Sequence, residues 1–535
     1  MNDTTYLARE KALSILQSFE PKPTSLISYQ SNGRVLVLGD EAALKNCRQF
    51  AEPLVITSLI MAAKTTLPGD IALAGRKIEI RGYLGRFEIT LTDKQGAEQV
   101  VPADIVLDLN PRPLIGLEIP PPGYLHVPPG EFDVQQVEAQ LQEMTGEFEK
   151  PRFFNYDASI CAHGVNGVTV CTQCIDACPA GAIHSLVEKI EVVPQLCQGG
   201  GVCATVCPSG AIQYAYPRLT DSGNLLRKML QAYHEQGGQD AVIVFYSAED
   251  FPKELLQGRG SVLPFKVEEL AAVGMDLCVS ALAYGASQVV LLADEQVPAS
   301  ALQNLQRQLD WLHPLLEGLD IPPQRVTLAD RPDAILWQAE PWLIEAALYA
   351  MPGNKRDALF LAIDHLYQQR GKVRELVELP AGAPFGKASI DENRCTLCMA
   401  CVGACPGKAL QDGSNRELPE VFFIESHCLQ CGACTQTCPE DAISISPRII
   451  FDREKRNRSR VLNQDVPFAC VSCGKPFAPT TVIHKMTDKL KHHHMFQSSR
   501  ALNRLKMCDD CRVADIVQDP AAMNGNFDAH IPDND

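Results

Sequence analysis

CTLCMACVGACP at residues 395–406 and CLQCGACTQTCP at residues 428–439 decide the fold of this chain. Both stretches follow the pattern C-x2-C-x2-C-x3-C-P, and each continues into a short apolar segment, as CPGKAL and CPEDAI. The same ending recurs upstream as CPAGAI at 178–183 and CPSGAI at 207–212. Four copies of one element predict two modules, each built from two similar halves.

The second module, residues 385–450, has the bacterial ligand pattern for iron–sulfur clusters. Three thiolates at this spacing surround one [4Fe-4S] cluster, and the cysteine before the proline ligates the neighbouring cluster. Two zinc sites are the alternative, but they do not need eight cysteines with two C-P endings. We expect a 2[4Fe-4S] ferredoxin module with two ligand sets: Cys395, Cys398, Cys401 and Cys438, then Cys405, Cys428, Cys431 and Cys434.

The first module, residues 151–220, is less regular. In CTQCIDACP, the three cysteines match the second, third and fourth positions of the pattern, so the first ligand must come from elsewhere. Cys161 lies ten residues before Cys171 and is the obvious donor. The expected ligands of this cluster are Cys161, Cys171, Cys174 and Cys207.

The other half of this module lacks a ligand. CQGGGVCATVCP has cysteines at the first, third and fourth positions, but Gly200 stands at the second. The thiolates left for this site are those of Cys178, Cys197 and Cys203. They predict a [3Fe-4S] cluster, or a labile [4Fe-4S] cluster with one open iron, and a vestigial site is the alternative.

Residues 465–520 predict a different metal site, similar to a zinc ribbon. Two C-x2-C pairs supply Cys470, Cys473, Cys508 and Cys511, and a tetrahedral zinc ion held by four thiolates would close a domain without a large core. A redox-active C-x-x-C motif is less suitable, because such motifs come singly. His492, His493 and His494 between the pairs are expected to be solvated, and the remaining Cys47 and Cys278 to be buried thiols.

The rest of the chain predicts α/β domains. Residues 1–150 contain a buried-strand candidate, RVLVLGD, and an alternating β pattern, RKIEIRGYLGRFEITLTD, and end in a proline-rich segment expected to be an extended linker. Residues 221–335 alternate apolar strands with helical patterns, which predicts a parallel sheet. Residues 336–384 are expected to form a helical linker. The fold class is therefore multidomain α/β and α+β, with a degenerate nucleotide-fold-like domain at the N-terminus.

Composition limits the partners. The chain of 535 residues has 48 Lys and Arg against 65 Asp and Glu, so its formal charge of −17 makes nucleic acid an unlikely partner. The N-terminus has no signal-peptide pattern, and no apolar run reaches the roughly 18 residues that span a bilayer. We expect a cytoplasmic protein without membrane insertion, in which clustered cysteines bind metal instead of forming disulfides.

Most of the chain resembles a family of cytoplasmic multi-cluster ferredoxin-type proteins that bacteria encode with formate dehydrogenases. The stretches that carry the resemblance are YDASICAHGVNGVTVCTQCIDACPAGAI, the doubled C-P motifs and the terminal CGKPF and KMCDDCRV. The resemblance implies electron transfer for such a dehydrogenase.

Two further segments resemble pieces of larger redox complexes. RVLVLGDEAA with IRGYLGRFEITL is similar to the flavin-binding subunit of heterodisulfide reductases, but Asp40 and Glu41 follow Gly39 and would oppose a pyrophosphate. VEELAAVGMDLCVSALAYGASQVVLLA resembles the small iron–sulfur subunit of hydrogenases but keeps only Cys278, too few thiols for a [2Fe-2S] cluster.

Three functions are therefore considered. The first is an iron–sulfur electron carrier (polyferredoxin) that works with an oxidoreductase such as formate dehydrogenase and has no catalytic residues of its own. The second is a flavin- or NAD-linked reductase subunit, and the third is a redox-sensing maturation factor that recognises a dehydrogenase.

Overall fold

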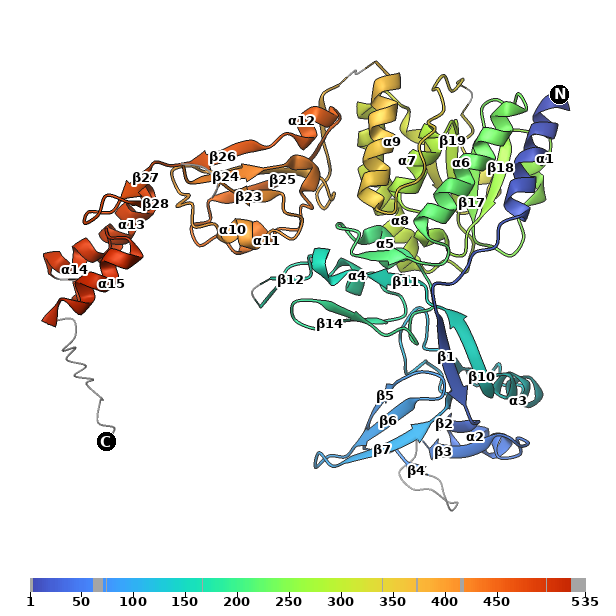
Figure 1. The fold of residues 1–535 in the computed structure, drawn as a ribbon. Helices are drawn as coiled ribbons and strands as arrows, with labels where there is room; N and C mark the ends of the chain where they lie inside the picture. The colour runs from blue at the N-terminus through green and yellow to red at the C-terminus, as the bar shows by residue number, and fades with distance from the viewer. Residues whose placement is uncertain are drawn as a thin grey trace. The chain divides into compact units, whose positions relative to one another are not determined.

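The computed structural model divides the chain into two compact units, Met1–Val377 and Glu378–Asp535. Figure 1 shows the mixture of helices and small sheets in each. The structure describes residues 3–60, 71–73, 75–165, 167–338, 340–371, 374–413, 418–496 and 498–520. Within these ranges, no helix combines the length and the apolarity needed to cross a membrane.

The N-terminal domain is built on a five-stranded sheet whose neighbouring strands run parallel. Strand β2 lies at its centre and is buried from its second residue onward, as expected for a parallel strand covered on both faces. In sheet order, the strands are β4 (Ile71–Ala72), β3 (Val55–Ile60), β2 (Arg34–Gly39), β8 (Ile105–Asp108) and β9 (Tyr124–His126). The proline-rich segment expected as a linker thus contributes strand β9.

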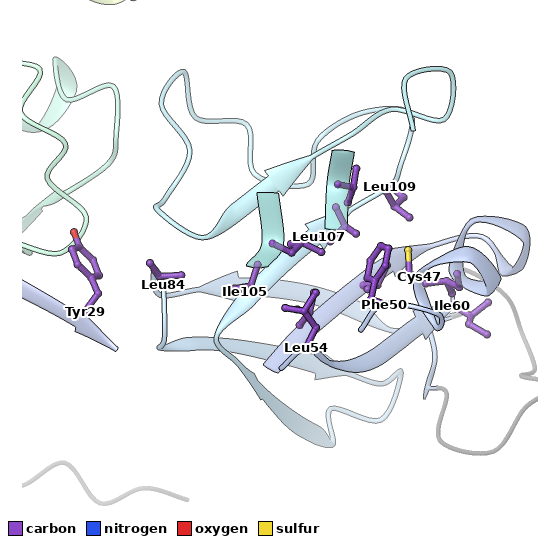
Figure 2. Close-up of a cluster of buried hydrophobic side chains, with 14 residues drawn as sticks. Tyr29, Cys47, Phe50, Leu54, Ile60, Leu84, Ile105, Leu107 and Leu109 are labelled. Carbon is purple, nitrogen blue, oxygen red and sulfur yellow. The ribbon is translucent and has the colours of Figure 1, made fainter. Parts of the chain in front are cut away.

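Helices and a smaller sheet complete this domain. Figure 2 shows part of its core, where Cys47, Phe50 and Leu107 are among the buried side chains. The other elements are helices α2 (Glu41–Cys47) and α3 (Val134–Glu143), and the antiparallel strands β5 (Lys77–Arg81), β6 (Phe87–Thr92) and β7 (Glu98–Ala103). An antiparallel pair, β1 (Leu26–Ser31) and β10 (Gly146–Pro151), then leads into the first cysteine-rich module.

The first cysteine-rich module is closed by strands from its two ends. Strand β11 pairs antiparallel with β16, so residues near 155 and 213 lie side by side. Apart from Cys171, its cysteines belong to a small apolar core or pack against it. The elements are β11 (Phe154–Tyr156), β12 (Gly164–Val165), β13 (Val168–Thr169), α4 (Gln173–Asp176), β14 (Ile183–Ser185), β15 (Ile190–Val192), α5 (Val202–Val206) and β16 (Ile212–Tyr214).

The central domain has a four-stranded parallel sheet with the order β18-β17-β19-β20. Each strand is followed or preceded by a helix that covers the sheet, the arrangement that alternating strand and helix patterns produce. The strands are β17 (Val242–Tyr246), β18 (Val262–Lys266), β19 (Gln288–Leu292) and β20 (Val326–Ala329), and the helices are α6 (Leu219–Glu235), α7 (Met275–Ala283) and α8 (Ala299–Gly318).

Two helices differ from the division into domains that the sequence suggests. Helix α1 (Asp3–Gln17) packs against α6 and β18 of the central domain instead of joining the rest of residues 1–150 (Figure 1). Helix α9 (Lys355–Gln369) packs against α7, and the described residues 340–354 before it contain no helix. In the described part of 336–384, expected to be a helical linker, helix α9 instead packs on the central domain and buries Leu359, Ile363 and Leu366.

The second unit contains the regular cysteine module and the tail. Residues Cys395, Cys401, Cys405 and Cys428 take part in its apolar core. Its module elements are β22 (Gly386–Ile390), α10 (Ala400–Gly403), β23 (Leu410–Asp412), β24 (Glu420–Phe423), α11 (Ala433–Gln436), β25 (Ile443–Ile450), α12 (Arg453–Asn457) and β26 (Arg460–Gln464), while β21 (Leu376–Glu378) spans the boundary between the units in the sequence. The tail has β27 (Pro467–Ala469), β28 (Pro476–Pro479), α13 (Thr480–Leu490), α14 (Ser499–Arg504) and α15 (Asp509–Val517).

Candidate metal centres

The regular module groups its eight cysteines around two small cavities. Each cavity receives three thiols from one half and one thiol from the C-P ending of the other half. The first is lined by Cys395, Cys398, Cys401 and Cys438, and the second by Cys405, Cys428, Cys431 and Cys434. These are the two groups that the spacing predicts, and the exchange of one ligand brings the centres into a single core.

The C-P endings of all four halves contain the same turn. The third residue after the cysteine is left-handed in each: Gly181 (φ 57°), Gly210 (φ 74°), Lys408 (φ 52°) and Asp441 (φ 44°). A left-handed conformation is costly for the two residues that are not glycine, so the surrounding structure must hold it. The shared turn shows that the repeat in the sequence is also a repeat in the backbone.

This turn directs a backbone N–H at the cysteine sulfur. Ala182 donates to Cys178 Sγ at 3.4 Å, Ala409 to Cys405 Sγ at 3.2 Å and Ala442 to Cys438 Sγ at 3.3 Å. In the fourth half a hydroxyl is interposed: Ala211 N–H donates to Ser209 Oγ at 3.2 Å, and Ser209 Oγ lies 3.6 Å from Cys207 Sγ. Donors at sulfur stabilise the thiolate, the form that binds metal, and hydrogen bonds to cluster sulfurs tune reduction potentials.

The loop around Gly200 has the backbone of a cluster-binding loop. The second cysteine of each regular loop is flanked by two left-handed residues, Leu397 and Met399 at φ 55° and 61°, and Gln430 and Gly432 at φ 52° and 83°. Gly200 is flanked in the same way by Gly199 and Gly201, at φ 85° and 72°. Gly200 itself is not left-handed, and a Cβ built on it would lie 3.7 Å from Pro179 Cγ, an ordinary contact. Nothing in the backbone therefore requires glycine at this position.

The structure brings the remaining cysteines of the first module close together, with three of them at one cavity. Cys178, Cys197 and Cys203 line one cavity together with Gly200. Burial, followed by the charges of Cys207, Cys171 and Cys161, raises the pKa of Cys174 to about 12, so these four thiols lie within electrostatic reach of one another. Buried thiols this close together are unfavourable as thiolates unless a cation is present, and a bound iron–sulfur cluster would supply that positive charge.

His163 holds Cys161 beside Cys171, a role that the sequence analysis missed. Its ring is 1% exposed, with Nδ1 2.7 Å from the carbonyl oxygen of Cys171 and Nε2 2.8 Å from Ser185 Oγ. The carbonyl oxygen of His163 also accepts from Val170 N–H at 2.7 Å. These contacts hold together the two ends of the segment between Cys161 and Cys171. In the sequence, the histidine of CAHG is the one residue that could have indicated this role.

Two lysines place positive charge beside the Gly200 site, and neither was singled out from the sequence. Lys150 Nζ donates to the carbonyl oxygens of Gln195 and Cys197 at 2.9 and 2.6 Å, and burial lowers the lysine pKa to about 8. Lys355 Nζ donates to the carbonyl oxygens of Ala204 and Thr205 at 2.7 and 2.8 Å. Through these hydrogen bonds, both ammonium groups hold the backbone of residues 195–205, the segment that contains Cys197 and Cys203.

The charge of Lys355 also reaches Cys207. Burial would raise the pKa of Cys207, but the Lys355 ammonium and hydrogen bonds to the sulfur lower it. Burial lowers the pKa of Lys355 itself, while the Cys207 and Asp276 charges oppose that shift. This lysine therefore favours the thiolate that the ligand pattern assigns to the neighbouring cluster.

The tail brings its four cysteines to one point. The sulfur atoms of Cys470, Cys473, Cys508 and Cys511 all lie within 4.8 Å of one another. Burial would raise the pKa of Cys470, but backbone N–H groups, including that of Ser472, lower it to about 6. Four converging thiols at this spacing can hold a metal ion, and they are of the type that structural zinc sites use.

The cysteines and histidines left out of these groups lie where the sequence suggests. Cys47 and Cys278 are 0% and 2% exposed, so neither is accessible as a ligand. The side chains of His492, His493 and His494 are exposed. In the N-terminal domain, β2 ends at Gly39 and α2 begins at Glu41, so two acidic residues stand where a dinucleotide fold presents its helix N-terminus to pyrophosphate.

Comparisons with known families agree with the cysteine modules. Residues 394–443 match a family described as a 4Fe-4S dicluster domain, and residues 190–213 match one described as a 4Fe-4S binding domain. The second match includes Gly200. A search of the curated proteins found no match. The chain therefore contains two 4Fe-4S ferredoxin-type domains, which indicate an iron–sulfur electron-transfer protein.

Proposed function

We propose that this chain passes electrons to or from a cytoplasmic oxidoreductase such as formate dehydrogenase, with no bond chemistry of its own. The observation that carries the proposal is the exchange of C-P cysteines in the regular module, where Cys438 joins the first group of thiols and Cys405 joins the second. A bound iron–sulfur cluster supplies one-electron transfer at a potential set by charge, hydrogen bonds and exposure.

The residues support a specific set of bound groups. Each regular cavity offers four thiols, most of them packed in an apolar core, which fits a [4Fe-4S] cluster, and the group of Cys161, Cys171, Cys174 and Cys207 offers the same number. The cavity at Gly200 offers three thiols on a cluster-type backbone, which favours a [3Fe-4S] cluster over a vestigial site. The four thiols of the tail fit zinc. In the proposal, the chain holds three [4Fe-4S] clusters, one [3Fe-4S] cluster and one zinc ion.

The protein's own side chains would control how it accepts electrons. Backbone N–H groups at the cysteine sulfurs and the ammonium groups of Lys150 and Lys355 stabilise added negative charge. The apolar residues around the cysteines exclude water from the centres. These features suit a carrier, because they allow a change of charge with little movement.

The test starts from protein purified without oxygen, by measuring iron, acid-labile sulfide and zinc per chain and titrating the visible absorption with a reductant. Formate with a purified formate dehydrogenase should then bleach the protein at catalytic enzyme concentrations. A Cys398→Ser variant should lose one regular cluster, while Cys47→Ser, a change at a buried thiol outside the groups, should retain all of them. Colourless protein without sulfide would refute the carrier function; bleaching by dithionite but not by the enzyme would refute only the partner.

A further inference from the structure

A cavity of about 290 Å³ lies at the carboxyl edge of the central parallel sheet, apart from the thiol cavities. Its walls come from the residues after β18, the first turns of α6 and α7, and strand β16 of the first module. Open α/β sheets bind ligands at the carboxyl ends of their strands. The volume suits a small molecule, and apolar side chains such as Ile212, Val267 and Val273 form much of the lining.

The unbalanced charge on this cavity is negative. Glu268 and Glu269 lie two and three residues beyond the end of β18 and line the cavity, and within the described ranges their carboxylates accept no hydrogen bond and form no ion pair. Burial, followed by the charges of Glu268 and Asp294, raises the pKa of Glu269 to about 6. At neutral pH the cavity therefore presents two carboxylates whose mutual repulsion a bound cation would relieve.

The cations in the lining do not neutralise these carboxylates. Lys355 donates to two backbone carbonyl oxygens, and Asp276 is the carboxylate within its electrostatic reach. Arg218, the residue before α6, pairs with Asp221 in the first turn of that helix, with Nε 3.0 Å from Oδ2. Both positive side chains are engaged elsewhere.

Tyr214 forms part of the wall between this cavity and the thiol cavity at Gly200, because it lines both. Its hydroxyl is buried and has no hydrogen-bond partner among the described residues. Burial, followed by the charges of Glu269 and Glu268, raises the pKa of the phenol, so the hydroxyl stays protonated. A buried hydroxyl without a partner is unfavourable, so Tyr214 leaves one hydrogen-bonding requirement unmet in the wall that the two cavities share.

We propose that this cavity binds a small organic cation, a protonated amine on a compact apolar body. The ammonium group would lie against Glu268 and Glu269, and the body against the apolar wall. The same carboxylates exclude carboxylate and phosphate ligands, including the pyrophosphate of a dinucleotide.

The test is calorimetric titration of the full-length, cluster-loaded protein with three probes of one shape: benzylammonium, benzyl alcohol and benzoate. Benzylammonium should bind at least about tenfold more tightly than benzyl alcohol, and benzoate should not bind. Glu269→Gln should weaken benzylammonium binding by about tenfold. The matched control is Glu254→Gln, a change at an exposed carboxylate outside the cavity, which should leave the affinity unchanged.

Glu268→Gln provides a second variant at an exposed position, where folding is not at risk. Equal affinities for the three probes, no benzylammonium binding, or an equal loss in the Glu254 control would overturn the inference. These outcomes are independent of the proposed function. Protein that contains its clusters but does not bind benzylammonium would refute only the proposed ligand of the cavity. Protein that lacks clusters but binds benzylammonium would refute only the proposed electron-carrier function.

Discussion

Gly200→Cys should convert the irregular site into a four-thiolate cluster. The backbone on either side already has the left-handed residues of the regular loops, and the new Cβ would make an ordinary 3.7 Å contact with Pro179. Gly200→Ala, which adds the same Cβ without a thiol, should raise the free energy of unfolding by about 0.4–1 kcal/mol by restricting the unfolded chain. The available space and the backbone conformation therefore favour a side chain at position 200. The Gly200→Cys and Gly200→Ala variants differ only in the thiol sulfur.

The same change at a neighbouring glycine should be destabilising. A Cβ on Gly201 would lie 2.6 Å from Ala272 Cβ, and its φ of 72° is unfavourable for any other residue. Gly201→Ala should therefore lower the free energy of unfolding by about 1–3 kcal/mol. This variant is the control for damage to the loop.

The assay is paramagnetic resonance of the oxidised protein, because an oxidised [3Fe-4S] centre gives a signal and an oxidised [4Fe-4S] centre of the ferredoxin type is silent. The wild type and Gly200→Ala should each show about one spin per chain, and Gly200→Cys close to none, with iron rising from about 15 to about 16 per chain. A folded Gly200→Cys protein with the full signal would refute the argument from the backbone. A silent oxidised wild type with four irons at this site would refute the three-iron cluster.

Three further predictions concern charge. Lys150→Met should lower the reduction potential of the Gly200 site by about 70–100 mV, from one charge removed at roughly 7–10 Å and an effective dielectric of about 20, measured by a titration monitored by paramagnetic resonance; an unchanged potential would contradict it. Glu425 is 5% exposed and pairs with Arg448 and Arg460 at 2.8 Å, so Glu425→Gln should lower the free energy of unfolding by about 3–5 kcal/mol in urea, and a loss below about 1 kcal/mol would show that the arginines find other partners. Because folding raises the pKa of Glu269 from 4.5 to about 6, its protonated form stabilises the fold at low pH, and this contribution is lost as pH rises from about 4.5 through 6; Glu269→Gln should flatten that part of the stability profile, and an unaltered slope would exclude the residue as its cause.

The cysteine groups could be predicted from the sequence because cluster binding is mostly local. Ligands such as Cys428, Cys431 and Cys434 fall within seven residues, and the C-P ending fixes the direction of the fourth ligand. The parallel strands of the central domain could also be predicted from local sequence, because a short apolar run between two helical patterns is typical of a buried strand.

The features that the sequence did not show depend on distant contacts. Helix α1 joins the central domain through contacts such as Arg9 Nη1 to the carbonyl oxygen of Arg259 at 2.9 Å, across 250 residues. Lys150 precedes the segment 195–205 in the sequence and Lys355 follows it, and both donate hydrogen bonds to carbonyl oxygens of that segment. The periodicity of apolar residues predicts which face of a helix is buried, but it does not predict which domain that face packs against. For a single lysine, the sequence does not indicate which groups its ammonium will contact.

The asymmetry between the modules predicts the order of their potentials. Each regular cavity has four thiols and the cavity at Gly200 has three, but an oxidised [3Fe-4S] core carries one positive charge fewer than an oxidised [4Fe-4S] core, so the ligand count alone leaves the net charge of the centres equal. Lys150 and Lys355 add positive charge to the backbone of that same site. The two ammonium groups stabilise an added electron there, since nearby charges and dipoles set cluster potentials. A stepwise reductive titration should reduce the Gly200 centre first; if a regular centre is reduced before it, the electrostatic argument fails even if the ligand groups are correct.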